Sequence, residues 1–226
     1  MVEICNLYGI AMELHEMGFH LVSTDEMTGI QALERKYATK STKPGQVERR
    51  EFEYIRHGTL CLIANWHVAL GKVISPTIGP TRTEVDYVEH TRQTVAADPD
   101  AWWIFINDGL NTHQSEGLVR FVAESCKLDV ELGEKGKSGI LQSMKTRKDF
   151  LSDPTHRIRF IYTPKHTSWL NQIEIWFSIL VRRVLKRASF KSLEELRQRI
   201  LEFIDYFNKT MAKPFRWTYT GQALAI

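Results

Sequence analysis

The sequence contains no long apolar run, and its first residues lack the pattern of a secretion signal. A helix that crosses a bilayer needs about 20 consecutive apolar residues, and no stretch of the 226 residues approaches that length. The N-terminal segment MVEICNLYGIAMELHEMGFH is interrupted by Glu3, Glu13, His15 and Glu16, whereas a signal peptide has an unbroken apolar centre. We therefore expect a protein with no membrane segment that works in the cytoplasm.

Cysteine is scarce as well. Cys5, Cys61 and Cys126 are odd in number, far apart and without CxxC spacing. This pattern argues against a disulfide framework or a zinc site built from them, and it is typical of a reducing cytoplasm. Internal repeats and low-complexity tracts are also absent, so the sequence is that of an ordinary globular chain.

The chain has little net charge. Its 30 Lys and Arg residues against 27 Asp and Glu residues give +3, which is too small to indicate a nucleic-acid partner by itself. The positive charge is concentrated after residue 135, however. A hydrophobic content of 43% and a length of 226 residues are enough for one sizeable core.

Apolar periodicity and turn signals divide the chain into strands and helices. We expect a short N-terminal helix packed against the core, strands at 18–25, 58–68, 72–78, 102–108 and 157–162, and helices at 83–98, 114–126, 168–187 and 192–207. Segments 29–52 and 133–150 have no clear period and are expected to be connections. Three consecutive strands followed by alternating helices and strands predict an α/β fold, with one mixed sheet and helices on both faces.

The helix expected at 168–187 carries a single carboxylate, that of Glu174. Ser168 is its expected N-cap. Its apolar stripe consists of Trp169, Ile173, Phe177, Leu180 and Val184. Glu174 lies at the edge of this stripe, so taken alone it is a border residue that reaches water or pairs with an arginine.

Two expected strands end on an aspartate, Asp25 and Asp108. The ends of strands meet at the rim of a sheet, where sites in α/β folds are usually found. If the two strands are neighbours, the like charges of these carboxylates need a cation beside them. With Glu174 as a third ligand, the set fits two Mg²⁺ or Mn²⁺ ions and phosphoryl transfer. The alternative is that both aspartates are turn or cap residues, and Glu26, Asp86 and Asp149 are competing carboxylates.

Three blocks around these carboxylates resemble a known family. STDEMTGIQALER contains Asp25, INDGLNTH contains Asp108, and TPKHTSWLNQIEIWFSIL contains Glu174. Together they are similar to the signature blocks of bacterial insertion-sequence transposases related to mariner elements, the IS-six-thirty group, with its DDE catalytic domain. The resemblance runs from about residue 18 to residue 221. It implies a ribonuclease H-like fold, with these three residues as the catalytic, metal-binding triad of a DNA-cleaving and strand-transferring enzyme.

The resemblance also implies a division of the chain and a set of partners. It suggests an N-terminal helical remnant or extension at 1–17, the DDE catalytic domain at 18–210 and a C-terminal tail at 211–226. The implied partners are double-stranded DNA, as transposon ends and target, and a second copy in a homodimer. Full-length relatives begin with a helix-turn-helix region, so we expect either the second half of a split transposase, with an upstream helix-turn-helix frame product as partner, or a truncated copy.

Several polar and basic residues near the triad are candidates for supporting roles. Asn111, His113 and Asn171 are candidates for positions behind the metal ligands. For His113 the alternatives are contact with metal-bound water or a phosphate and, as the favoured interpretation, a local hydrogen bond within its loop; a two-metal site needs no general base. Gly109 stands where many relatives have Asn. Candidates for contact with DNA are Lys145, Arg147, Lys165, His166, Trp169, Arg182, Arg183, Lys186 and Arg187. For Trp169 the favoured interpretation is nevertheless packing in the core, and for the basic residues a solvated face is the alternative.

Two other functions remain open from the sequence. An inactive remnant would only bind DNA or dimerise, and a ribonuclease H-like nuclease would cut RNA–DNA hybrids. An upstream reading frame that encodes a helix-turn-helix would favour the fused enzyme over the remnant, and a comparison of hybrid with duplex DNA as substrate would identify the nuclease.

Overall fold

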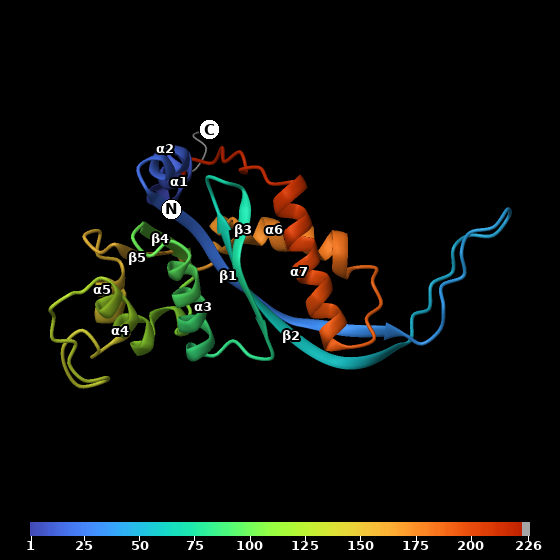
Figure 1. Ribbon diagram of the computed structural model, residues 1–226, viewed down its shortest axis with the longest axis horizontal. Coiled ribbons are helices and arrows are strands. Elements are labelled where there is room, and N and C mark those ends of the chain that lie inside the picture. The colour runs from blue at the N-terminus through green and yellow to red at the C-terminus, as the bar shows by residue number, and fades with distance from the viewer. Residues whose placement is uncertain (223–226) are drawn as a thin grey trace.

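A five-stranded sheet runs through the centre of the computed structural model, which describes residues 1–222 (Figure 1). Its strands are β1 (Phe19–Arg35), β2 (Tyr54–His67), β3 (Lys72–Gly79), β4 (Trp102–Asn107) and β5 (Ile158–Tyr162). The order across the sheet is β3-β2-β1-β4-β5. Strand β2 is antiparallel to β1 and β3, while β4 is parallel to β1 and β5, so the predicted mixed sheet is confirmed.

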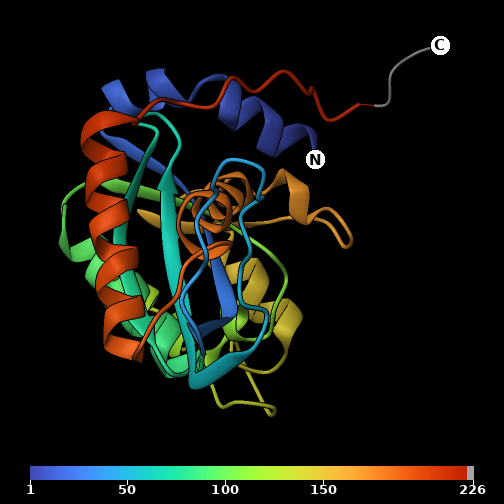
Figure 2. The ribbon, with the colours of Figure 1, turned by 90° about the vertical axis from the view of Figure 1, so that its right-hand side faces the viewer.

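Helices cover both faces of this sheet, as predicted. They are α1 (Val2–Gly9), α2 (Ala11–Glu16), α3 (Glu84–Ala96), α4 (Glu116–Ser125), α5 (Met144–Leu151), α6 (Ile173–Leu180) and α7 (Leu193–Thr210). Figures 1 and 2 show α6 and α7 on one side and α3, α4 and α5 on the other, with α1 and α2 at one end of the sheet. None of the helices within residues 1–222 has the length and apolar content needed to cross a bilayer.

The alternation of side chains along the strands produces a hydrophobic core on each face. Leu21 and Ile104 belong to the core under α1, α6 and α7, whereas their chain neighbours Val22 and Phe105 belong to the core under α3, α4 and α5. Each large apolar side chain buried in this way stabilises the fold by about 1.5–3 kcal/mol. The two cores clamp β1 and β4 at the centre of the molecule, which makes these strands a rigid base for a site at their ends.

Strand β1 is much longer than predicted. The predicted strand ends at residue 25 and is followed by a predicted connection at 29–52, but β1 continues to Arg35 and β2 already begins at Tyr54. The register of β1 against β2 shifts between Met27 and Ile30 and again between Gln31 and Leu33. Such bulges break the two-residue alternation from which a strand is recognised, and this explains why the prediction was wrong. Residues 36–53 remain as the connection, which projects away from the body (Figure 1).

Helix α6 begins later than predicted. Ser168 is not its N-cap: Ser168–Leu170 form a 3₁₀ turn (η2), Asn171 is extended, and the α-helix starts at Ile173. The turns of Val181–Leu185 (η3) are π-helical. Trp169 therefore lies outside the buried stripe and is 50% exposed, so the favoured packing interpretation for it was wrong.

The other helices differ from the prediction mainly in segment 133–150. This segment contains α5, whose N-cap Ser143 exchanges hydrogen bonds with Thr146. The capping box predicted at Thr83 and Asp86 is confirmed at the start of α3. The short N-terminal helix is present as α1 and α2, and Ile4 of α1 is buried in the core. Within the predicted tail at 211–226, residues 223–226 lie outside the described residues.

Candidate metal centre at the ends of β1 and β4

Asp25 and Asp108 lie just past the parallel pairing of β1 and β4. The last pair in that register is Ser23 of β1 with Ile106 of β4, two residues before each aspartate. Asp25 is buried within β1, which continues to Arg35, so it does not end its strand as predicted, whereas Asp108 directly follows the last residue of β4. The charge of Asp108 acts on the pKa of Asp25, which shows that the two carboxylates are near each other.

The segment before Glu174 is fixed to the same part of β1. The amide N–H of Ile173 donates to Ser23 Oγ at 3.0 Å. The side-chain amide of Asn171 donates to the carbonyl of Thr24 at 2.8 Å and to Asp25 Oδ2 at 3.3 Å. Ser23 Oγ in turn donates to Asn171 Oδ1. These bonds hold the first turn of α6, which carries Glu174, beside the buried Asp25.

The three carboxylates are close enough to affect one another's ionisation. Burial raises the pKa of Asp25 to about 7, against the opposing hydrogen bond from the backbone N–H of Glu26. The charges of Asp108, Glu26 and Glu174 add to that rise. Burial, and then the charge of Asp108, also raise the pKa of Glu174. Such mutual repulsion is relieved when a cation lies among the carboxylates.

His113 forms a buried bridge behind Asp108. Its Nδ1 lies 2.7 Å from Asp108 Oδ1, and its Nε2 lies 3.0 Å from Glu26 Oε1. Burial works to lower the pKa of His113, but the hydrogen bonds to Asp108 and Glu26 outweigh it and raise the pKa to about 9. The ring is therefore an imidazolium at neutral pH and donates from both nitrogens.

The bridge in turn keeps Asp108 ionised. Burial works to raise the pKa of Asp108, but the hydrogen bond and the charge of His113 bring it below its ordinary value. The ring of Tyr87 lies 4.3 Å from that of His113, and Tyr162 Oη donates to the His113 carbonyl at 2.7 Å. Both contacts fix the position of the imidazolium.

Glu26 is the residue of this centre whose role the sequence reasoning missed. It points to the face of the sheet opposite Asp25, as expected if the strand continued, and was set aside as a competing carboxylate. Its side chain is only 1% exposed, and within the described residues its Oε2 has no hydrogen-bond partner. The signal available in the sequence was its position directly after Asp25, but the partner His113 is 87 residues away.

The donor set of Asp25, Asp108 and Glu174 has the chemistry of a site for hard divalent cations. Carboxylate oxygens are the ligands that Mg²⁺ and Mn²⁺ prefer. Within residues 1–222, the three residues do not form a group whose ligand atoms all lie within 4.8 Å of one another.

A small cavity lies beside Asp108. Asp108, Gly109, Leu110 and residues 163–168 line about 280 Å³ of space, with Lys165 and His166 exposed on its wall. His166 has a φ of 62°, a strained backbone conformation for a residue other than glycine. Asn111 lines a different hollow, and within the described residues its side chain has no hydrogen bond to the triad.

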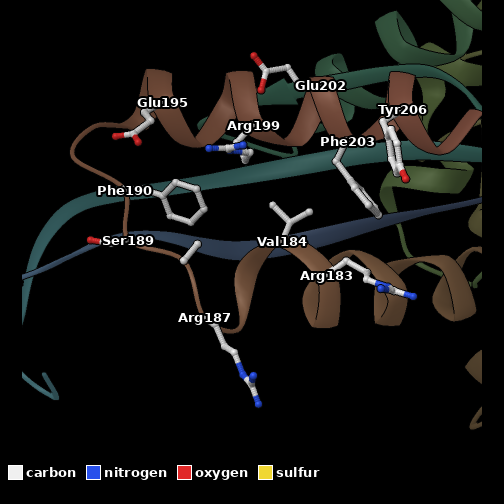
Figure 3. Close-up of a pocket in the computed structure, with 11 residues that line it drawn as sticks. Arg183, Val184, Arg187, Ser189, Phe190, Glu195, Arg199, Glu202, Phe203 and Tyr206 are labelled. Atoms are coloured by element: carbon white, nitrogen blue, oxygen red, sulfur yellow. The ribbon is translucent and has the colours of Figure 1, made fainter. Parts of the chain in front are cut away.

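Of the predicted basic contacts, four lie together after α6. Arg182, Arg183, Lys186 and Arg187 are exposed, and within residues 1–222 no ion pair joins any of them to an acidic side chain. Arg183 and Arg187 line a groove of about 570 Å³ between η3 and α7, which also contains Arg199 (Figure 3). Arg187 points away from α7 in this view.

The two basic residues predicted on segment 133–150 differ from each other. Lys145 is exposed on α5. Arg147 is used within the fold, since its Nε donates to the carbonyl of Gln114 at 2.7 Å and its Nη1 to that of Leu141 at 3.2 Å. Of these two, only Lys145 presents its charge freely to solvent.

Comparison with known proteins identifies the family and the fold of this chain. Residues 20–197 match the family model described as DDE superfamily endonuclease. The fold is similar to a pre-cleavage Mos1 transpososome (TM-score 0.52, 14% identity, 91% of this chain and 55% of that chain) and to the Mos1 Strand Transfer Complex (0.52, 16%, 91% and 53%). The catalytic domain of Mos1 mariner transposase also matches (0.50, 11%, 90% and 79%).

No curated protein sequence matches the chain. The chain spans about half the length of the Mos1 chains in the first two structures, and the match to the Mos1 catalytic domain confirms the ribonuclease H-like fold. The family model covers 178 of the 226 residues, from 20 to 197, including Asp25, Asp108 and Glu174. The chain belongs to the DDE superfamily endonuclease family.

Proposed function

We propose that this chain is the catalytic domain of a DNA transposase. It hydrolyses a phosphodiester bond at the end of a transposon and joins the freed 3′-hydroxyl to target DNA. The observation that carries the proposal is the meeting of Asp25, Asp108 and Glu174, from two parallel strands and one helix, with pKa values that respond to one another. The family model and the Mos1 structures support it.

The triad would hold two divalent cations, Mg²⁺ or Mn²⁺. When bound, such ions activate the attacking water or hydroxyl and stabilise the leaving oxygen. Asp25 is oriented by the Asn171 amide, and its raised pKa means that cations displace a proton from it on binding. Asp108 is held by His113 in the ionised form that a cation needs.

His113 and Glu26 would act by positioning Asp108 and would not touch DNA. The imidazolium is completely buried between two carboxylates, so it has no path to a substrate. Its two N–H donors fix the Asp108 carboxylate in one rotamer, and the buried charge of Glu26 stabilises the imidazolium form. His113 would thus support Asp108, and Asn171 would support Asp25.

DNA would lie over the rim of the sheet. Lys165 and His166 flank the cavity beside Asp108, and the half-exposed Trp169 would stack on an unpaired base. Further along the chain, Arg182, Arg183, Lys186 and Arg187 offer unpaired positive charge to phosphates, with Lys145 as a separate contact. One of the similar structures is the Mos1 transposase paired-end complex with left transposon end, which supports a DNA partner. Because two transposon ends are held together in a paired-end complex, we also propose that this chain forms a homodimer, with one copy for each end.

The test of this function is Mg²⁺-dependent nicking of supercoiled DNA that carries the sequences flanking the gene. Asp108→Asn should reduce nicking by about 10³-fold or more, because a missing metal ligand removes several kcal/mol of transition-state stabilisation. Asp149→Asn, which changes an exposed carboxylate of α5, is the matched control. Nicking that survives in Asp108→Asn, with Asp149→Asn active, would overturn the assignment.

Three further measurements test the nuclease alternative, the homodimer and the helix-turn-helix partner. An RNA–DNA hybrid offered in the same assay identifies a ribonuclease H-like nuclease if it is the better substrate. Sedimentation with and without transposon-end DNA tests the homodimer. Co-expression with the product of any upstream helix-turn-helix frame should raise end-specific cleavage, and an absence of any such frame would contradict the split arrangement.

A further inference from the structure

Three histidines from three separate elements meet at the N-terminal end of β1, five residues before Asp25. His15 is in the last turn of α2, His20 is the second residue of β1, and His67 ends β2. One ring nitrogen from each lies within 4.8 Å of the other two. The ring centroids are 5.1 to 5.8 Å apart.

Ring nitrogens of the three histidines face one another inside this cluster. His20 Nδ1 lies 2.9 Å from His67 Nε2, so the two rings share a single hydrogen bond. His67 is 1% exposed. His15 Nδ1 is buried, and among residues 1–222 it has no hydrogen-bond partner. A buried ring nitrogen without a partner is costly, and a ligand that accepts its lone pair would remove that cost.

A carboxylate on the outside of the histidine cluster binds one of the three rings. Asp98, in the turn before β4, accepts from His20 Nε2 at 2.9 Å. A carboxylate on the outer nitrogen of a histidine fixes the ring and makes its inner nitrogen a better metal ligand. With Nε2–H donated to Asp98, the lone pair of His20 Nδ1 points into the cluster.

We propose that His15, His20 and His67 form a second metal site, which binds a transition-metal ion of the Zn²⁺ type. Imidazole nitrogens suit Zn²⁺, Co²⁺, Ni²⁺ and Cu²⁺, whereas Mg²⁺ takes oxygen ligands. Three histidines and one water give the four ligands of a tetrahedral zinc ion. Cysteine spacing could not reveal this site, because no cysteine takes part in it.

The site is structural and separate from the carboxylate centre. His20 and Asp25 are five residues apart on one strand, which is about 16 Å. A metal ion would tie α2 to the ends of β1 and β2, and Asp98 would add the turn before β4. One rearrangement is needed: the Leu70 amide donates to His67 Nδ1 at 3.3 Å, and this long hydrogen bond breaks when Nδ1 takes the ring proton and Nε2 binds metal.

Titration of the purified full-length chain with Co²⁺, followed by its ligand-field absorption, tests the proposal, and Zn²⁺ should displace the Co²⁺. The double variant Asp25→Asn/Asp108→Asn, which removes the carboxylate centre, should keep one Co²⁺ site with the affinity and absorption of the histidine site in the wild type. His15→Gln should weaken binding by more than about 100-fold, and Asp98→Asn by about 10–100-fold. His57→Gln, at the far end of the β1–β2 pair, should bind as the wild type does.

Thermal unfolding with and without Zn²⁺ separates metal binding from folding. In the Asp25→Asn/Asp108→Asn background, which lacks the carboxylate centre, Zn²⁺ should raise the Tm, and the added change His15→Gln should abolish that rise. The proposal is overturned if the wild type binds no Co²⁺, if His15→Gln binds as tightly as the wild type, or if the Asp25→Asn/Asp108→Asn variant loses the ion.

Discussion

At the scale of single residues, His113 links two carboxylates that the chain places far apart. Asp108 lies five residues before it and Glu26 lies 87 residues before it. The sequence shows only a histidine shortly after a strand-end aspartate. The fold converts that histidine into a buried imidazolium whose two N–H groups are both used. Its charge is therefore part of the stability of the centre as well as of its chemistry.

Removing His113 should leave Glu26 as a buried, unpaired charge. We expect His113→Gln to destabilise the fold by about 3–5 kcal/mol, and the added change Glu26→Gln to restore a large part of that loss because it removes the charge. Urea unfolding of both single variants and the double variant measures the coupling. Additive effects of the two substitutions would show that no such pair exists.

Asp25 should make the stability of the metal-free protein depend on pH. Its folded pKa of about 7 lies above the ordinary 3.8, so the folded state holds a proton that the unfolded state has released. The contribution of Asp25 to stability is therefore present at low pH and is lost as pH rises from about 4 to about 7.

Asp25→Asn keeps the neutral form and removes this loss. The variant should be close to the wild type near about pH 4 and more stable by at most about 4 kcal/mol near about pH 8. Saturating Mg²⁺ should stabilise the wild type at neutral pH and leave the variant unchanged. Guanidinium unfolding at several pH values checks this, and a difference that stays constant with pH would contradict it.

At the scale of elements, helix α6 holds Glu174 in position. Its buried residues Ile173, Trp176, Phe177 and Leu180 pack in the core that includes Leu21 of β1. The segment before it is fixed by side-chain bonds to β1 at Ser23 and Asp25. At the start of the helix, the amide N–H of Ile173 donates to Ser23 Oγ, and Asn171 is extended with its side-chain amide bonded to β1.

Two tryptophans of this region test where α6 begins, because one lies before the helix and the other lies within it. Trp176 is fully buried in α6, whereas Trp169 is 50% exposed in the turn before it. Trp176→Ala should cost about 3–5 kcal/mol of stability, and Trp169→Ala should change it by no more than about 0.5 kcal/mol. If Trp169 stacks on a base, only its substitution should weaken binding of single-stranded DNA while the fold stays intact. Equal losses of stability would contradict the exposed position of Trp169.

At the scale of the whole molecule, the four exposed basic residues follow directly on the helix that carries Glu174 of the carboxylate centre. Residues 173–187 run without a break from Glu174 to the four exposed basic residues. A DNA duplex that contacts these basic residues would therefore lie next to α6, the helix that carries Glu174.

The salt dependence of DNA binding tests that arrangement. The slope of log K against log salt should become shallower by about 0.9 for each phosphate that the protein no longer neutralises. We expect Arg183→Gln/Arg187→Gln to reduce the slope by up to about 1.8, whereas Lys209→Gln, whose charge is paired with Asp205, should leave it unchanged. Filter binding over a series of salt concentrations measures the slope, and an unchanged slope in the arginine variant would place DNA elsewhere.

The sequence by itself determined β4 and the start of β1. The apolar run at 102–108 predicted β4 with Asp108 directly after it, and Phe19, Leu21 and Val22 predicted the start of β1. The predicted end of β1 at Asp25 was wrong, because the strand continues to Arg35. The capping box at Thr83 likewise fixed the beginning of α3. Patterns of this kind are local, because each depends on residues within one or two turns or one strand of each other.

Only the tertiary structure decided which distant side chains meet. Asn171 reaches Asp25 across 146 positions, and His20 reaches His67 across 47. Such meetings depend on strand order and register, which the bulges in β1 alter after Met27 and which local periodicity does not encode. For the same reason the buried bridge through His113 and the histidine cluster at the N-terminal end of β1 became visible only in the folded chain.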